Sequence, residues 1–120
     1  MRVRIPDDAS ARATGADAVA AAFAAAGATV ERVSSWGMQW LEPLVEVDGI
    51  GHANVSESDV DAIVAGDDRL AIGPVAEHPF IARQQRLTFA RAGRTRPLSL
   101  EDYAATGGWR GLAEARRIGP

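Results

Sequence analysis

Hydrophobic and polar residues alternate in four short runs, and this pattern predicts four β-strands. The runs cover residues 2–5, 28–33, 41–47 and 50–55. Between the first two runs, an alanine-rich segment places Val19 and Phe23 about one turn apart, which predicts an amphipathic helix. Asp7 or Asp8 is suited to cap the start of this helix, and Gly27 ends it. This half of the chain therefore has the strand-helix-strand order of a βαβ unit.

The third and fourth runs are separated by Asp48-Gly49, a pair that predicts a tight hairpin. After the hairpin, Ser56 and Asp59 have the spacing of a helix capping box, with aspartate at the position that glutamate usually occupies. The buried face of this second helix is expected to consist of Val60, Ile63 and Val64. Residues 1–78 thus have the order strand, helix, strand, strand, strand, helix, which indicates one α/β domain.

Residues 79–120 have a different pattern, in which short apolar pieces alternate with arginine, glycine and proline. Ser99 starts a predicted helix with acidic residues in its first turn, where the helix dipole favours negative charge. Gly107-Gly108 interrupts this helix before a helical pattern resumes over residues 109–117. We therefore expect an irregular connector followed by helices, appended to the α/β domain.

The composition and charge exclude several classes of function. The chain has 13 arginines, no lysine and 16 acidic residues, and its net charge of -3 argues against a nucleic-acid partner. It has no cysteine, which excludes disulfides, thiolate nucleophiles and cysteine ligation of iron-sulfur clusters. No apolar run reaches the roughly 20 residues of a membrane span, and the first residues, MRVRIPDD, lack the apolar core of a signal peptide. A cytoplasmic location is expected.

No residue pattern predicts a catalytic, cofactor-binding or metal-binding site in this chain. His52 and His78 are isolated from each other and from any carboxylate cluster, so ordinary surface or capping roles are expected for both. Ser35 has no evident base and no nucleophile-elbow context. The acidic residues around the second helix lack the spacing of a calcium loop and are expected to be solvated.

The segment SSWGMQWLEPLVEVDG resembles the second half of the two-iron cluster site in thioredoxin-like ferredoxins. Gly37 and Pro43 fall on the glycine and the proline of that family's pattern, and the two family cysteines fall on Ser35 and Gln39. Serine and glutamine are poor ligands for a site of this softness. The resemblance therefore implies a thioredoxin-like α/β fold in which the cluster has been lost.

The first pair of family cysteines is placed by a glycine that follows them at the start of the first helix. Aligning that glycine with Gly15 puts the two cysteine positions at Pro6 and Ala11. Neither side chain has a donor atom for iron. All four ligand positions implied by the resemblance are thus occupied by residues that cannot replace a thiolate.

Residues 79–112, PFIARQQRLTFARAGRTRPLSLEDYAATGGWRGL, resemble the segment that precedes the flavin domain in two kinds of NADH-binding subunit. These are the β subunits of NAD-dependent formate dehydrogenases and the corresponding subunit of respiratory complex I. Such enzymes pass electrons through iron-sulfur clusters and flavin mononucleotide to or from NAD. The chain has no glycine-rich phosphate loop, so the resemblance implies that residues 79–120 lead toward a flavin domain absent from this sequence. Whether this chain acts as an enzyme is left open.

This resemblance implies a non-catalytic role in subunit packing, with other subunits of a formate dehydrogenase or NADH dehydrogenase complex as partners. The expected partner contacts are Trp36, Trp40, Arg83, Arg86 and Arg91, since tryptophan and arginine are frequent interface anchors. For the two tryptophans a second interpretation is open, that they fill the space vacated by the cluster. Two alternative functions are a free-standing thioredoxin-like binding or assembly module and a small oxidoreductase, which would require flavin or iron to co-purify.

Overall fold

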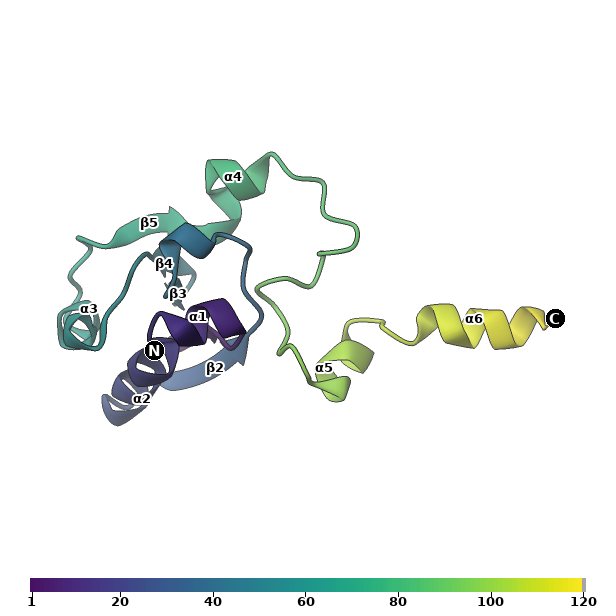
Figure 1. Cartoon of the computed structure of the whole chain (residues 1–120), viewed down its shortest axis with the longest axis horizontal. Coiled ribbons are helices and arrows are strands. Elements are labelled where there is room, and N and C mark those ends of the chain that lie inside the picture. The colour runs from purple at the N-terminus through teal and green to yellow at the C-terminus, as the bar shows by residue number, and fades with distance from the viewer. Residues whose placement is uncertain (120) are drawn as a thin grey trace.

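The computed structural model describes residues 1–119, and these contain one mixed five-stranded sheet of order β2-β1-β3-β4-β5 (Figure 1). The strands are β1 (Arg2–Pro6), β2 (Thr29–Val33), β3 (Val45–Val47), β4 (Ile50–His52) and β5 (Ala71–Pro74). β1 and β2 are parallel, and the other neighbouring pairs are antiparallel. The α-helices are α1 (Ala9–Ala13), α2 (Ala16–Ala25), α3 (Val60–Val64), α4 (Pro79–Ala82), α5 (Leu100–Ala105) and α6 (Arg110–Ile118).

The predicted first helix is divided into two at Gly15, so the prediction of one continuous helix was wrong. Asp8 caps α1 by accepting a hydrogen bond from the backbone N–H of Ala11 at 3.1 Å. Gly15 has φ 105°, a left-handed conformation that glycine adopts without steric cost, and it precedes α2. The redirected α2 buries Val19 and Phe23 as the sequence pattern predicts, and the chain turns into β2 after Gly27.

The predicted hairpin between β3 and β4 is confirmed. Val47 pairs with Ile50, and Asp48 and Gly49 connect them with φ angles of 46° and 96°. The strands on both sides are shorter than predicted. Residues 39–41 form a short 3-10 turn, and Pro43 follows in a cis peptide bond with Glu42. The strand begins only at Val45, because proline has no N–H to contribute to a sheet.

Strand β5 is not predicted by the sequence pattern. It forms because the backbone of β4 allows close approach: a Cβ atom at Gly51 would lie 2.8 Å from Val75 Cγ2. Gly51 pairs with Gly73 across the two strands. β5 lies at the edge of the sheet, where Pro74 is tolerated.

The buried residues form two clusters. The larger cluster packs α1, α2 and α3 against the sheet through residues such as Ile5, Phe23 and Ile63. The smaller cluster lies beyond the end of β2 and consists of Val33, Trp36, Met38, Leu44 and Val75. The predicted capping box, in which Ser56 and Asp59 bond reciprocally, is at the start of a 3-10 turn, Glu57–Asp59, which continues into α3.

The C-terminal helices extend away from this body, and the described part of the chain measures 58 × 31 × 24 Å (Figure 1). Ser99 caps α5 as predicted, by accepting a hydrogen bond from the N–H of Asp102 at 3.0 Å. Gly107 and Gly108 separate α5 from α6, also as predicted. The short helix α4 was not predicted. None of the helices within residues 1–119 combines the length and the hydropathy that crossing a membrane requires.

Candidate functional site

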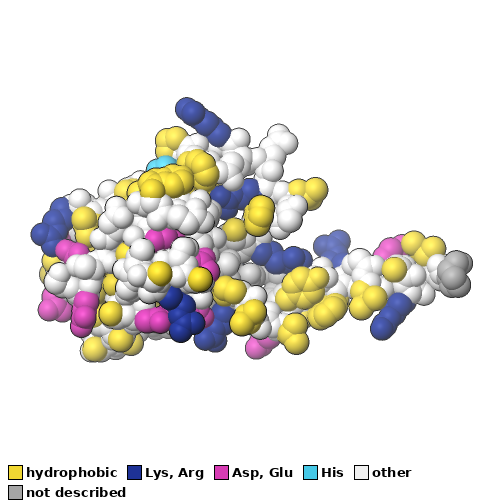
Figure 2. Space-filling model, in the orientation of Figure 1, with side chains coloured by type: hydrophobic (Ala, Val, Ile, Leu, Met, Phe, Trp, Pro, Cys, Tyr) yellow, Lys and Arg dark blue, Asp and Glu magenta, His cyan; other side chains and the backbone are white. Residues whose placement is uncertain are grey.

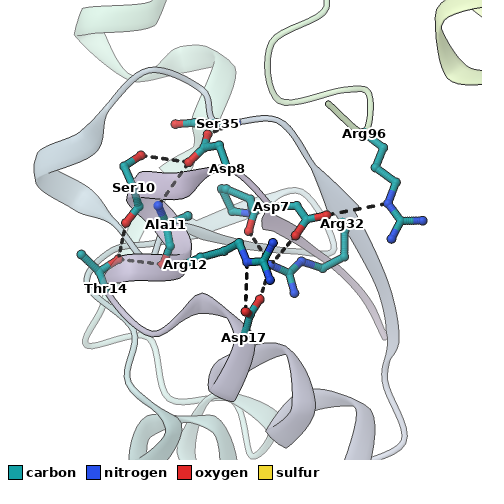
Figure 3. A network of polar contacts seen from close by, with 11 residues as sticks. Asp7, Asp8, Ser10, Ala11, Arg12, Thr14, Asp17, Arg32, Ser35 and Arg96 are labelled. Carbon is teal, nitrogen blue, oxygen red and sulfur yellow. Dashed lines mark hydrogen bonds and ion pairs between the residues drawn. The ribbon is translucent and has the colours of Figure 1, made fainter. Parts of the chain in front are cut away.

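Two of the implied ligand positions, Pro6 and Ala11, lie at the end of β1 and in α1, and the other two lie in the segment after β2. The loops after β1 and β2 are adjacent because these strands are parallel neighbours. Asp8 joins the two loops (Figure 3). Its Oδ1 accepts hydrogen bonds from Ser10 Oγ at 2.9 Å and from the N–H of Ala11 at 3.1 Å. Its Oδ2 accepts one from the N–H of Ser35 at 2.9 Å. A carboxylate thus cross-links the start of α1, which contains Ala11, to the loop that contains Ser35.

Ser35 continues this network into the protein interior through Glu42. The hydroxyl of Ser35 donates to Glu42 Oε1 at 2.8 Å and accepts from the N–H of Gly37 at 3.0 Å. The other oxygen of Glu42 accepts from the N–H of Leu44 at 2.9 Å. We call the connected side chains of Asp8, Ser35 and Glu42 the polar bridge.

Glu42 is a buried carboxylate, with only 5% of its surface exposed. Burial raises the pKa of Glu42 and the negative charge of Asp8 acts in the same direction, while the hydrogen bonds from Leu44 and Ser35 oppose the shift. Sequence reasoning missed both Asp8 as a loop cross-link and Glu42. The available signal for Glu42 was an acidic residue between Leu41 and Pro43 in an otherwise apolar segment.

The residues at the four implied ligand positions do not fit an iron-sulfur cluster. Pro6 and Ala11 are buried and have no side-chain donor. The hydroxyl of Ser35 is already committed to two hydrogen bonds, and Gln39 is exposed at the start of the 3-10 turn. Within residues 1–119, no group of three or more histidine, cysteine or acidic side chains is placed to hold a metal ion.

The two histidines have structural roles. His78 caps α4, with Nδ1 accepting from the N–H of Phe80 at 3.3 Å, in agreement with its predicted role. His52 is buried at the end of β4, and its Nδ1 lies 3.2 Å from the carbonyl of Ile50. The prediction of a surface role was wrong for His52, because its strand lies between β3 and β5.

The two tryptophans of the loop after β2 occupy different environments. Trp36 is only 6% exposed and belongs to the smaller core cluster. Trp40 is 56% exposed and stacks edge-to-face with Phe80, with ring centroids 4.9 Å apart. Hydrophobic side chains gather over α4 and along the C-terminal extension (Figure 2). Of the two tryptophans, Trp40 has the exposure that a contact with another protein requires.

The three arginines expected to contact a partner are also placed differently from one another. Arg83 is exposed at the end of α4. Arg86 is partly buried and donates to the carbonyl of Trp36 at 2.7 Å. Arg91 donates to Thr106 Oγ1 at 2.8 Å and lies 4.8 Å from the ring centroid of Tyr103. Partner contact by these residues stays a prediction, since the geometry describes only their contacts within the chain.

A groove with a cavity volume of about 310 Å³ lies between the loop after β2 on one side and α4 with the segment that follows it on the other. Its walls are mainly apolar and contain Trp36, Phe80, Phe89 and Ala92, with Ser35 and Arg86 among its polar residues. Phe80 belongs both to this groove and to the exposed pair with Trp40. The groove and the aromatic pair together form one apolar surface next to the implied ligand positions.

No protein-family model matches this chain, and no curated protein matches it in sequence. Solved structures match it in fold. A thioredoxin-like 2Fe-2S ferredoxin from Aquifex aeolicus has a TM-score of 0.54 and 18% sequence identity, over 65% of this chain and 94% of the ferredoxin. A cysteine-to-serine variant of a thioredoxin-like 2Fe-2S ferredoxin from the same organism has a TM-score of 0.51 and 20% identity, over 60% and 97% of the two chains.

Because the sequence identities are this low, these matches show the fold alone. The similarity of the structures confirms the predicted fold class. The chain differs from these ferredoxins in having no cysteine that could bind a cluster. It also has a helical C-terminal extension. The chain therefore has the mixed α/β fold of the thioredoxin-like ferredoxins, without a cysteine-ligated cluster.

Proposed function

We propose that this chain is a non-catalytic, thioredoxin-like module that packs against other subunits of an NAD-dependent formate dehydrogenase or a related NADH dehydrogenase. In this proposal residues 1–78 form the packing module, and residues 79–120 connect it to the flavin-bearing part of the complex. The module contributes position and stability to the assembly and takes no part in electron transfer.

The loss of redox function is supported by the chemistry of the loops after β1 and β2. They contain no thiolate, the thioether of Met38 is buried in the smaller core cluster, and their central polar groups bond to one another through the polar bridge. A serine hydroxyl held by Glu42 and Gly37 has no free role in binding iron. The loops are therefore suited to hold a fixed shape, which a packing surface requires.

The packing role is carried mainly by one observation, the exposed edge-to-face pair of Trp40 and Phe80 beside an apolar groove. Large aromatic side chains that are exposed beside a groove are typical of interface anchors. Arg83 lies just after α4 and adds a positive charge near this pair. The choice of formate dehydrogenase rests on the resemblance of residues 79–112 to the segment that precedes the flavin domain of its β subunit.

Co-purification with candidate subunits tests this proposal, with Trp40→Ala as the variant. The matched control is Trp109→Ala, because Trp109 is 49% exposed and also stacks edge-to-face, in its case with Tyr103 at 5.0 Å. The two substitutions thus remove the same side chain from similar environments, one beside the groove and one on the extension.

We expect the wild-type chain and Trp109→Ala to retain the formate dehydrogenase subunits, and Trp40→Ala to lose them while its unfolding midpoint stays unchanged. Full retention by Trp40→Ala would show that the aromatic pair is not the docking surface. If the wild-type chain retains no subunit of either complex, the assignment to these enzymes fails, and a free-standing binding or assembly module becomes the better account.

A further inference from the structure

We propose that the loops after β1 and β2 serve as an intramolecular docking site for the chain's own connector, residues 86–96, and that the polar bridge keeps this site in shape. The proposal goes beyond subunit packing, because it assigns a role to Ser35, one of the implied ligand positions, and to its neighbours Ser34 and Trp36. It requires no partner protein.

The connector is attached to the loop after β2 at Ser34. The N–H of Ser34 donates to the carbonyl of Thr95 at 2.6 Å. The N–H of Gly93 donates in turn to the carbonyl of Ser34 at 3.1 Å, and it also lies 3.2 Å from Ser34 Oγ. One residue of the loop, Ser34, therefore binds two residues of the connector through backbone groups.

Trp36 provides the second attachment. Arg86 donates to the backbone carbonyl of Trp36 at 2.7 Å. Gly93 lies directly against the indole ring, since a Cβ atom at this glycine would overlap Trp36 Nε1. The buried indole thus packs against Gly93 of the connector, and the hydrogen bond from the guanidinium group of Arg86 holds the backbone of Trp36 in place.

The loop after β1 adds a weaker electrostatic contact. Arg96 Nε lies 3.8 Å from Asp7 Oδ2 (Figure 3). The same carboxylate is 3.1 Å from Arg32, so Asp7 lies between a body arginine and a connector arginine. The connector therefore contacts both loops that the parallel strands β1 and β2 bring together.

Neighbouring residues of the loop after β2 contact different parts of the chain. Ser34 and Trp36 hold the connector, whereas Ser35 between them holds the body through Asp8 and Glu42. Because three consecutive residues share one backbone, a change in the hydrogen bonds of Ser35 must alter the positions of both connector contacts. The connector has no buried hydrophobic side chain of its own between residues 86 and 96, so these contacts determine its position.

The test is hydrogen exchange of single amides by NMR in the complete chain, without any partner. The variants are Ser35→Ala, which removes the hydroxyl, and Glu42→Gln, which keeps the size of the side chain but removes its charge and replaces one of its two acceptor oxygens by an NH2 donor. The matched controls are Ser56→Ala, which affects the capping box at residues 56–59, and Glu31→Gln, which affects an ion pair with Arg2 at 2.8 Å. The amide of Gly37 reports whether the bridge is broken, because it donates to Ser35 Oγ.

We expect Ser35→Ala to speed the exchange of the Gly93 and Ser34 amides by about fivefold or more, with a smaller effect of the same sign for Glu42→Gln. The amides of β1 and β3 should keep their wild-type rates, and both controls should leave Gly93 unaffected. The proposal is overturned if Gly37 exchanges faster in Ser35→Ala while Gly93 does not. It is also overturned if the controls speed Gly93 equally. Either result leaves the Trp40→Ala co-purification test unaffected.

Discussion

At the residue level, one implied ligand position of this cysteine-free thioredoxin-like ferredoxin fold, Ser35, is hydrogen-bonded to the neighbouring carboxylates of Asp8 and Glu42. Asp8 links the two loops, and Glu42 binds Ser35 from the interior. A buried carboxylate is costly unless it is hydrogen-bonded. Glu42 has two such bonds, one to a side chain and one to a backbone N–H. The loops are therefore held by charge-assisted hydrogen bonds.

Replacing Glu42 by glutamine should change how stability depends on pH. Burial raises the pKa of Glu42, so the folded chain keeps this proton to a higher pH than the unfolded chain, where glutamate titrates at about pH 4.3. Above that pH the folded state binds more protons, and the contribution of Glu42 to the free energy of unfolding falls as the pH rises through its folded pKa.

We therefore expect the wild-type chain to lose stability relative to Glu42→Gln as the pH is raised from about 4 to 7, measured by urea unfolding at a series of pH values. Glu31 has the opposite dependence, because its hydrogen bond with Arg2 lowers its pKa. Glu31 is present in both proteins, so its contribution to the pH dependence cancels when their stabilities are compared. Parallel pH profiles for the two proteins would contradict the expected role of Glu42.

Replacing Gly93 by alanine should displace the connector from Trp36. Gly93 has φ 74°, and a methyl group there would overlap the indole ring. We expect a loss of about 1–3 kcal/mol in the free energy of unfolding, together with a shift of the Trp36 indole N–H resonance. Gly73→Ala is the control, since Gly73 has φ 78° and no atom within 4 Å of the added methyl group. An indole resonance that shifts equally in both variants would argue against the contact.

At the scale of elements, the sequence predicts those features that depend on local signals. The hairpin at Asp48-Gly49, the capping box at Ser56 and the cap of α5 at Ser99 all follow from neighbouring residues. Strand β5 was missed because its sequence, AIGP, is short and carries no alternation, and it becomes a strand only by pairing with β4. The polar bridge was missed for a similar reason. Asp8 and Ser35 are 27 residues apart and meet only after β1 and β2 have paired.

Replacing Gly51 by alanine should separate β5 from β4. A Cβ atom at this position would lie 2.8 Å from Val75 Cγ2 and 3.1 Å from Ile72 Cγ1, both closer than side-chain atoms normally approach. We expect a destabilisation of about 1–3 kcal/mol, measured by thermal unfolding with circular dichroism. Gly111→Ala is the control, because α6 leaves open space around Gly111. Equal stability of the two variants would show that β5 does not depend on this close approach.

At the scale of the whole molecule, the body and the extension differ in charge and in packing. Residues 1–78 contain five arginines and thirteen acidic residues, whereas residues 79–119 contain eight arginines and three acidic residues. The extension also exposes Leu98, Leu100, Trp109, Leu112 and Ile118, whereas the body buries most of its large apolar side chains. The two parts of the chain therefore differ both in net charge and in the amount of apolar surface that they expose.

The purified chain should not retain an iron-sulfur cluster, because its loops offer no thiolate. We expect no visible absorbance and no bound iron after reconstitution with iron and sulfide under anaerobic conditions, followed by gel filtration. A cysteine-containing 2Fe-2S ferredoxin treated in parallel serves as the positive control. Stoichiometric iron with a visible spectrum would show that the chain is a redox protein, and the proposal of a non-catalytic module would be wrong.

The most direct test of the packing role is calorimetric titration of the chain with an isolated formate dehydrogenase subunit that co-purifies with it. We predict that Trp40→Ala weakens binding by about tenfold or more, as expected for an aromatic interface anchor, while Trp109→Ala changes it by less than about twofold. Equal dissociation constants for Trp40→Ala and the wild-type chain would contradict the claim that this apolar surface joins the module to its complex.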